Sequence, residues 1–281
     1  MKPISYLQRF DNVELAVRQR GSGIPLIWGH SLLGSVRVDD QAGIWDWEQF
    51  EQHSKLVRYD ARGHGNSDGS YDASDYRWDH LSTDMLSVAQ SVSNSRQRYV
   101  LGGASMGCST ALQAALAQPD RVAGLILVLP PTAWRSRGRQ VRKYRRQAWM
   151  SAALGATPYR ILDFLPDRHE DEDAQRRLSA TIARELTTAN PLYVQAALQG
   201  AALSDLPSKH KLRQLDVPTI IFSWRGDKVH PVSTAEILAD RLPDVRSLVV
   251  SDSDDVQGWT TQACQFLDQI SKPARRRKSA A

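Results

Sequence analysis

The chain has 281 residues, of which 36 are Lys or Arg, 31 are Asp or Glu and two are Cys, and 41% are hydrophobic. This composition excludes a disordered or fibrous chain and a disulfide-stabilised scaffold, and the length suits one large domain or a core with an insertion. The net charge of +5 comes from five cations within residues 272–281, so the rest of the chain is formally neutral and its charge gives no reason to expect nucleic-acid binding.

Residues 1–12 lack the apolar stretch of a signal peptide. The longest apolar run, residues 123–129, is too short to span a bilayer. We therefore expect a cytoplasmic protein that does not insert into a membrane, with both cysteines reduced.

Short apolar runs alternate with longer segments of helical character along the chain. The runs that predict strands are residues 13–19, 26–29, 56–60, 99–102, 125–129, 219–224 and 247–250. The segments that predict helices are residues 78–92, 106–117, 232–242 and 258–270. This alternation predicts an α/β fold with a mostly parallel, doubly wound sheet that helices cover on both faces.

Residues 131–216 interrupt this alternation, because they contain helix-favouring segments and no convincing strand. We expect a core of residues 1–130 and 217–271, a helical insertion at 131–216, and a disordered basic tail at 272–281. Seven cations lie within residues 135–146, and six acids lie within residues 163–173. We interpret the cations as a solvated helix face that pairs with these acids.

The strongest chemical motif is Gly-Ala-Ser-Met-Gly at residues 103–107, between a predicted strand and a predicted helix. A sharp strand-to-helix turn would project the Ser105 hydroxyl above the sheet, and the two glycines would let the backbones pack closely. This context predicts a nucleophilic serine. The alternative is a glycine-rich turn that only packs a helix against a strand.

Three further segments lie in a characteristic order around this motif. They are His-Ser-Leu-Leu-Gly-Ser at 30–35, Asp-Ala-Arg-Gly-His-Gly-Asn-Ser at 60–67 and Gly-Asp-Lys-Val-His-Pro at 226–231. With these motifs the sequence resembles the α/β-hydrolase superfamily, particularly its small cofactor-free esterases, lactonases, haloperoxidase-like enzymes and carbon–carbon bond hydrolases.

The resemblance implies an α/β-hydrolase fold with a helical cap, residues 131–216, inserted after the sixth strand. It implies an oxyanion hole formed by the backbone N–H groups of Leu32 and Met106, and a catalytic acid at Asp227. It implies a small-molecule substrate and no metal or cofactor. The pocket-lining candidates are His30, Ser31, Trp134 and Val229. Ser31 stands where the family usually has glycine, and we expect His30 to hold its loop in place.

The family also places a general-base histidine in the loop after the last strand, here residues 251–258, but this loop contains none. No histidine follows His230. One explanation is that His230 serves as the base, because a serine hydroxyl is a weak nucleophile without one. The acids that could orient its ring are Asp227, Asp252, Asp254 and Asp255. The other explanation is a broken triad.

Three functions therefore stay open at this point. The first is a hydrolase that cleaves a small ester, lactone or related acyl bond through Ser105. The second is a catalytically impaired ligand-binding protein on the same fold, and the third is a carbon–carbon bond hydrolase. No recognisable module predicts a nucleic-acid partner. The oligomeric state is open, and a homo-oligomer is among the alternatives.

Overall fold

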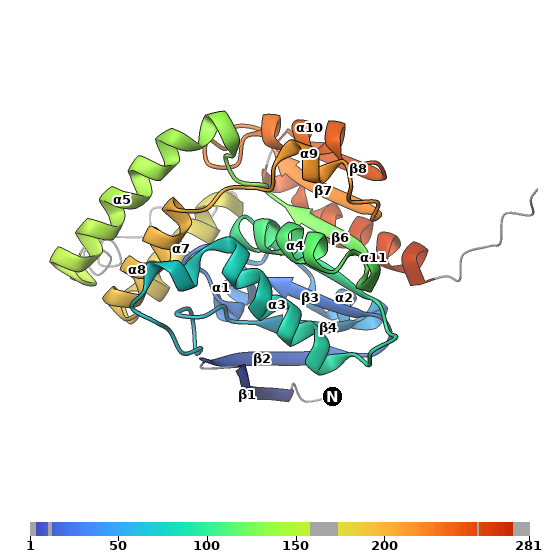
Figure 1. Ribbon diagram of the computed structural model, residues 1–281, viewed down its shortest axis with the longest axis horizontal. Helices are drawn as coiled ribbons and strands as arrows, with labels where there is room; N and C mark the ends of the chain where they lie inside the picture. Colours follow the sequence, from blue (N-terminus) through green and yellow to red (C-terminus); the bar gives the residue numbers. More distant parts are fainter. Residues whose placement is uncertain (1–3, 11–12, 158–173, 252, 272–281) are drawn as a thin grey trace, which may run out of the picture.

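The computed structural model describes residues 4–10, 13–157, 174–251 and 253–271 (Figure 1). Its centre is an eight-stranded sheet with the order β1-β2-β4-β3-β5-β6-β7-β8. The strands are β1 (Ile4–Phe10), β2 (Val13–Gly21), β3 (Pro25–Gly29), β4 (Lys55–Tyr59), β5 (Tyr99–Ala104), β6 (Val122–Val128), β7 (Thr219–Trp224) and β8 (Val245–Val250). β2 pairs antiparallel with both β1 and β4, and the other neighbouring strands pair in parallel. The mostly parallel sheet is therefore confirmed.

Helices cover both faces of this sheet, as expected for a doubly wound fold. They are α2 (Trp47–His53), α3 (Trp78–Val92), α4 (Met106–Ala117), α10 (Val232–Arg241) and α11 (Gln257–Ser271), while α1 (Val36–Ala42) packs against the segment between β6 and β7. Side chains alternate between the faces along each strand: Ile27 and Leu101 pack in one core with residues of α3, α4 and α10, whereas Leu26 and Val100 pack in a second core with residues of α2 and α11. The parallel strands β3, β5, β6 and β7 are thus buried on both faces, whereas the edge strand β8 is partly exposed.

The segment between β6 and β7 is helical or irregular wherever the structure describes it. It contains α5 (Arg137–Leu154), α7 (Ala174–Leu186), α8 (Pro191–Ala202) and α9 (Lys209–Leu212), of which α5, α7 and α8 lie at the left of Figure 1. The division into a core and a separate cap stays a prediction. The tail at 272–281 and the acids at 163–173 lie outside the described residues.

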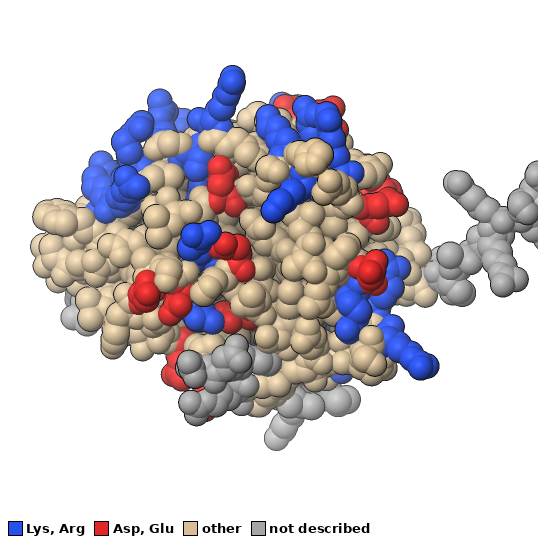
Figure 2. All heavy atoms as spheres, in the orientation of Figure 1, with Lys and Arg blue, Asp and Glu red and all other residues tan. Residues whose placement is uncertain are grey.

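Arg137 corrects the expectation that the cations of residues 135–146 form a solvated face. Its side chain is buried, lies 4.3 Å from the ring centre of Trp78, and donates to the backbone carbonyls of Thr132, Ala201 and Ser204 at 2.8–3.1 Å. The insertion needs a long donor here, because these three carbonyls converge on one buried point. The other six cations are exposed, and Figure 2 shows a group of them along α5.

Among the described residues, no helix is both long and apolar enough to cross a membrane.

Candidate active site

Ser105 lies at the turn between β5 and α4 with a backbone φ of 53° and ψ of −103°. A non-glycine residue with positive φ is strained and is held only by its surroundings. Here the Ser105 N–H donates to the Val128 carbonyl on β6 at 2.9 Å, which fixes the turn against the sheet. The Ser105 side chain therefore projects from a rigid corner at the carboxyl end of the central strands.

The two glycines of the motif permit this corner. A Cβ atom on Gly103 would lie 2.4 Å from the Gly29 carbonyl oxygen, and one on Gly107 would lie 2.0 Å from the same atom. Both separations are shorter than any real contact, so α4 can approach the end of β3 only because positions 103 and 107 lack side chains.

His230 lies between Ser105 and Asp227. Its Nε2 atom is 2.8 Å from Ser105 Oγ, and its Nδ1 atom is 2.6 Å from Asp227 Oδ2. An ionised carboxylate only accepts hydrogen bonds, so Nδ1 carries the proton and donates to Asp227. Nε2 then has a free lone pair, and it accepts a hydrogen bond from the Ser105 hydroxyl. The three side chains form one directed hydrogen-bond chain.

Asp227 is held ionised by its surroundings. Burial alone would raise its pKa, but the hydrogen bond and charge of His230, together with backbone hydrogen bonds, lower the pKa to about 2. The backbone N–H groups of Val229 and His230 donate to Asp227 Oδ1 at 2.7 and 3.1 Å. One carboxylate oxygen is thus fixed by its own loop, and the other is free to orient the imidazole.

The other acids considered as partners of His230 are Asp252, Asp254 and Asp255, and their role stays a prediction. Asp255 is exposed, and Asp252 and the side chain of Asp254 lie outside the described part of the chain.

The turn that contains Leu32 is tied to the helix that begins at Met106. Met106 is the first residue of α4, so its N–H has no acceptor within that helix. Leu32 lies in the turn that the Gly34 N–H closes on the Ser31 carbonyl at 2.9 Å, and the Gly107 N–H ties this turn to α4 through the His30 carbonyl at 3.2 Å. The role of the Leu32 and Met106 N–H groups as an oxyanion hole stays a prediction.

Both ring nitrogens of His30 are used within the protein. Nδ1 donates to the Ser31 carbonyl at 2.7 Å, and Nε2 accepts from the Ala61 N–H at 2.9 Å. Burial lowers the pKa of His30 to about 4, although the hydrogen bond to the Ser31 carbonyl raises it. The neutral ring therefore joins two turns and leaves no nitrogen for a substrate.

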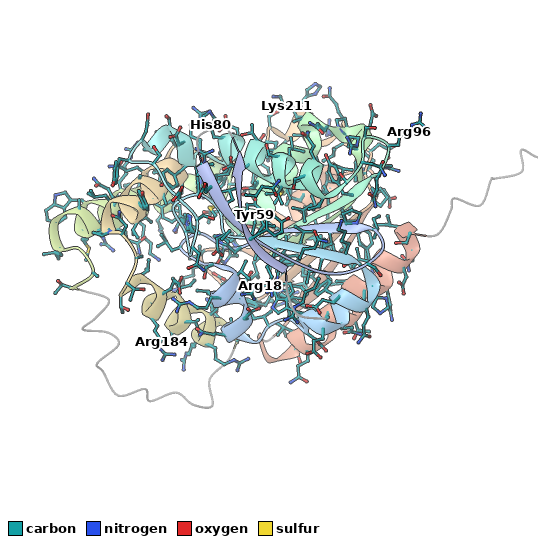
Figure 3. The ribbon with its side chains drawn as sticks, turned by 90° about the horizontal axis from the view of Figure 1, so that it is seen from below. Arg18, Tyr59, His80, Arg96, Arg184 and Lys211 are labelled. Atoms are coloured by element: carbon teal, nitrogen blue, oxygen red, sulfur yellow. The ribbon has the colours of Figure 1, made fainter. Side chains whose placement is uncertain are left out.

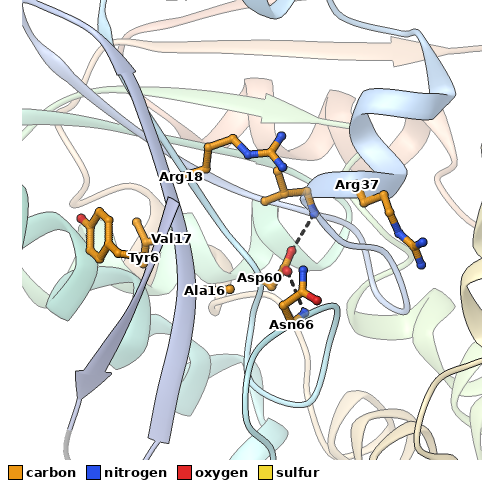
Figure 4. Close-up of a pocket in the computed structure, with 8 residues that line it drawn as sticks. Tyr6, Ala16, Val17, Arg18, Arg37, Asp60 and Asn66 are labelled. Carbon is orange, nitrogen blue, oxygen red and sulfur yellow. Dashed lines mark hydrogen bonds between the residues drawn. The ribbon is translucent and has the colours of Figure 1, made fainter. Parts of the chain in front are cut away.

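The turn at residues 60–67 is held by its own side chains. The Asp60 carboxylate accepts from the N–H groups of Val36 and Asn66 at 2.7 and 2.9 Å, and Ser67 Oγ donates to the Asp60 carbonyl at 2.6 Å. Figure 4 shows Asp60 in a cavity of about 340 Å³ beside β2, together with Arg18. Ser105 does not line this cavity, and the hydrogen bonds of Asp60 and Ser67 give these side chains a structural role in the turn.

Trp134 is held within the insertion, and Val229 joins the start of the insertion to the acid loop. The Trp134 indole N–H donates to the Pro207 carbonyl at 3.0 Å, and its backbone N–H donates to the Asp205 carboxylate at 3.0 Å. The Val229 carbonyl accepts from the Thr132 N–H at 2.9 Å. A pocket-lining role for Trp134 and Val229 stays a prediction.

The remaining described histidines have surroundings unlike those of His230. His64 is buried and donates to the Arg62 carbonyl, while His53 contacts Asp268 at 2.8 Å. His80 and His210 are exposed, and Figure 3 places His80 at the periphery of the molecule. His169 lies outside the described residues.

One functional candidate was missed by sequence reasoning. Asp39, on α1, is buried at the same corner of the fold as Ser31, although Asp-Asp-Gln at 39–41 resembles a surface sequence. The available signal was its position three residues after the buried Val36, which puts both side chains on one helix face. Among the described residues, no group of three or more His, Cys, Asp or Glu side chains could hold a metal ion.

Comparisons with known proteins agree with this fold. Residues 30–260 match the family model for the α/β-hydrolase fold. A Klebsiella pneumoniae protein named as a carbamate hydrolase, RutD, is 28% identical over 227 residues, which cover 78% of this chain and 78% of that protein. A pimeloyl-[acyl-carrier protein] methyl ester esterase of Nitrosomonas europaea is 25% identical over 222 residues, which cover 73% of this chain and 80% of the esterase.

The fold is also shared with a solved thermophilic esterase of Thermogutta terrifontis. That structure superposes with a TM-score of 0.77 at 20% identity, covering 97% of this chain and 100% of the esterase.

Proposed function

The chain belongs to the α/β-hydrolase fold family, and we propose that it is a serine hydrolase that cleaves a small ester, lactone or related acyl bond. The observation that carries this proposal is the chain of hydrogen bonds from Asp227 through His230 to Ser105, at 2.6 and 2.8 Å. The names of the relatives, a carbamate hydrolase and a methyl ester esterase, support a hydrolytic reaction at an acyl carbon.

In the proposed reaction, Ser105 Oγ attacks the substrate carbonyl carbon and passes its proton to His230 Nε2. The negative charge that develops on the carbonyl oxygen is stabilised by the N–H groups of Leu32 and Met106. Asp227 stabilises the imidazolium that forms. His230 then protonates the leaving oxygen, and a water molecule, deprotonated by the same ring, hydrolyses the acyl-serine to release the acid.

The proposal assigns acid and base to a single loop after β7. Asp227 and His230 are three residues apart, and the loop backbone fixes the carboxylate that orients the ring. This local arrangement requires no histidine in the loop at 251–258, so it accounts for the departure from the family pattern. It also argues against a vestigial pocket, because a protein that only binds ligands has no need for an oriented base in contact with a strained serine.

Fluorophosphonate labelling followed by peptide mapping tests the proposal, alongside turnover of p-nitrophenyl acetate. We expect one adduct on Ser105 and measurable hydrolysis, and we expect both to be lost in Ser105→Ala. A matched control is Ser109→Ala, which removes a buried hydroxyl one helical turn away that donates to the Ser105 carbonyl at 3.4 Å. Labelling that persists in Ser105→Ala, or no labelling of the wild-type protein, would overturn the proposed function.

A further inference from the structure

A small cavity adjoins the Ser105 corner. Its volume is about 20 Å³, which is room for one water-sized group. Ala104, the residue before Ser105, lines it from the end of β5, and Leu129 lines it from the end of β6. Leu178 of α7 lines it from the insertion. The cavity therefore lies where the core and the insertion meet, next to the residue that precedes the proposed nucleophile.

Two polar side chains line this otherwise apolar cavity, and both carry an atom without a partner. Ser31 Oγ and Asp39 Oδ2 are buried and have no hydrogen-bond partner in the part of the chain that the structure describes. An unsatisfied buried polar atom costs free energy, and two of them on one cavity of this size indicate a shared partner that the described residues do not supply. Ser31 is also the residue that replaces the usual glycine of this turn.

The Asp39 carboxyl is suited to such a partner. Burial raises the pKa of Asp39 to about 7, and the charges of Asp40 and Asp60 add to this rise. The charge of Arg58 and the interaction with the Trp28 side chain act in the opposite direction. Near neutral pH the carboxyl can therefore accept or donate a hydrogen bond, as the Ser31 hydroxyl can. The Asp39 carboxyl and the Ser31 hydroxyl together suit a ligand group that both donates and accepts hydrogen bonds.

We propose that Ser31 and Asp39 form a substrate subsite that binds one small polar substituent, a hydroxyl or an amino group, carried one or two atoms from the scissile bond. The proposal rests on the hydrolase function above. The subsite is placed near the reaction because its lining residues Ser31 and Ala104 directly precede the oxyanion residue Leu32 and the nucleophile Ser105. The apolar remainder of the cavity excludes a larger charged group. The structure thereby assigns a preference for short hydroxylated or aminated esters over apolar esters of the same size.

Matched ester pairs test the subsite on either side of the scissile bond. For the acyl side, p-nitrophenyl glycolate is compared with p-nitrophenyl propionate, in which a methyl group replaces the hydroxyl. For the alcohol side, 2-hydroxyethyl acetate is compared with propyl acetate. We expect the hydroxylated member of at least one pair to have about tenfold higher kcat/KM or more, because its apolar counterpart leaves the buried pair unsatisfied.

The variants Ser31→Ala and Asp39→Leu each remove one hydrogen-bonding partner. In each, the ratio of kcat/KM between the preferred pair of esters should fall to within about twofold of unity. Glu48→Gln is the matched control, since it neutralises an exposed carboxylate on α2 that does not line the cavity. The control should keep the wild-type ratio. Ser31→Ala places a small residue where the family has glycine, so it remains informative if Asp39→Leu does not fold.

The same ester pairs are titrated into Ser105→Ala, where dissociation constants are measured without turnover. Tighter binding of the hydroxylated ester there supports the subsite, even if the wild-type protein hydrolyses none of these esters. Such a lack of hydrolysis would contradict only the proposed function. No preference for either hydroxylated ester, in turnover or in binding, would overturn the subsite and leave the cavity as a place for solvent. A preference that survives both Ser31→Ala and Asp39→Leu would overturn it as well.

Discussion

His230 Nε2 lies 2.8 Å from Ser105 Oγ, although the two residues are separated by 125 positions in the chain. The sheet order explains the approach: β5 ends at the serine corner, β7 leads into the histidine loop, and β6 alone lies between them. Adjacent strands are about 4.8 Å apart, so the two loops emerge roughly 10 Å from each other, a gap that an imidazole side chain can cross. A base from the loop after β7 therefore needs no rearrangement of the fold.

The first prediction concerns the acid. Asp227→Asn removes the charge that stabilises the imidazolium and replaces an obligatory acceptor by a group that can donate to Nδ1. We expect kcat to fall by about 10³- to 10⁴-fold in a protein that still unfolds cooperatively. Steady-state kinetics with p-nitrophenyl acetate measures this, with circular dichroism for the unfolding transition.

Asp255→Asn is the matched control for Asp227→Asn. Asp255 is an exposed acid in the loop where the family has its histidine, and its removal should leave kcat within about twofold of wild type. If Asp255→Asn were as damaging as Asp227→Asn, the orienting role would belong to that loop.

The second prediction concerns the close packing behind Ser105. In Gly107→Ala the new Cβ would meet the Gly29 carbonyl oxygen at 2.0 Å, so α4 must move away from β3. We expect a loss of about 2–4 kcal/mol in the free energy of unfolding. Gly258→Ala serves as the control, because nothing lies within 4 Å of a Cβ there and alanine favours the helix. Equal effects of the two substitutions in urea titrations would refute the steric explanation.

The third prediction concerns Arg137. Arg137→Met keeps much of the apolar stem but leaves three buried carbonyl oxygens without their donor. We expect a destabilisation of about 2–4 kcal/mol, measured by chemical denaturation. Arg139→Met removes an exposed cation from the same helix and should change stability by less than about 0.5 kcal/mol. A destabilisation by Arg137→Met no larger than that of the control would contradict the buried role.

The fourth prediction is a pH dependence of stability. The folded-state pKa of Asp39, about 7, exceeds the ordinary value of 3.8, so folding takes up a proton between these pH values. The stabilisation that comes from the protonated Asp39 carboxyl is fully present below pH 4 and is lost as the pH rises through 7. Asp39→Asn lacks this titration, so its free energy of unfolding relative to wild type should increase by about 2–3 kcal/mol between pH 5 and pH 8.

Other titrating groups, including His30, are common to both proteins in this comparison and cancel in the difference. Urea titrations at the two pH values measure it. A difference that does not change with pH would mean that Asp39 is ionised in the folded protein throughout this range.

Much of the fold could be predicted from local patterns. The continuously apolar runs form the strands β5, β6 and β7. The segments predicted for α3 and α4 match the observed helices residue for residue. These elements are buried on both faces or strongly amphipathic, so their hydrophobic pattern alone identifies them.

The elements that were missed depend on contacts that local patterns do not contain. β1 is an edge strand that exists through its pairing with β2. The seven-residue helices α1 and α2 begin where the side chains of Ser35 and Asp46 accept from the backbone N–H groups of Val38 and Gln49. Arg137 and Asp39 are buried by distant segments, and a charged residue in a charged stretch gives no sign of this burial.

The candidate site divides in the same way. The serine turn and the acid loop follow from motifs with fixed spacing, and the absence of a later histidine directs attention to His230. Its contact with Ser105 depends on the order of strands in the sheet, which the sequence alone does not reveal. The unpartnered pair Ser31 and Asp39 depends on how α1 packs against the serine corner, and a one-dimensional pattern cannot report that packing.

The most direct test of the account is the turnover of p-nitrophenyl acetate by His230→Ala, with and without added imidazole. If His230 is the base, kcat should fall by about 10³-fold or more, fluorophosphonate labelling of Ser105 should slow in parallel, and imidazole should restore part of the rate. If a folded His230→Ala protein turned over ester and labelled Ser105 at the wild-type rates, the account would be contradicted, because another group would then activate Ser105.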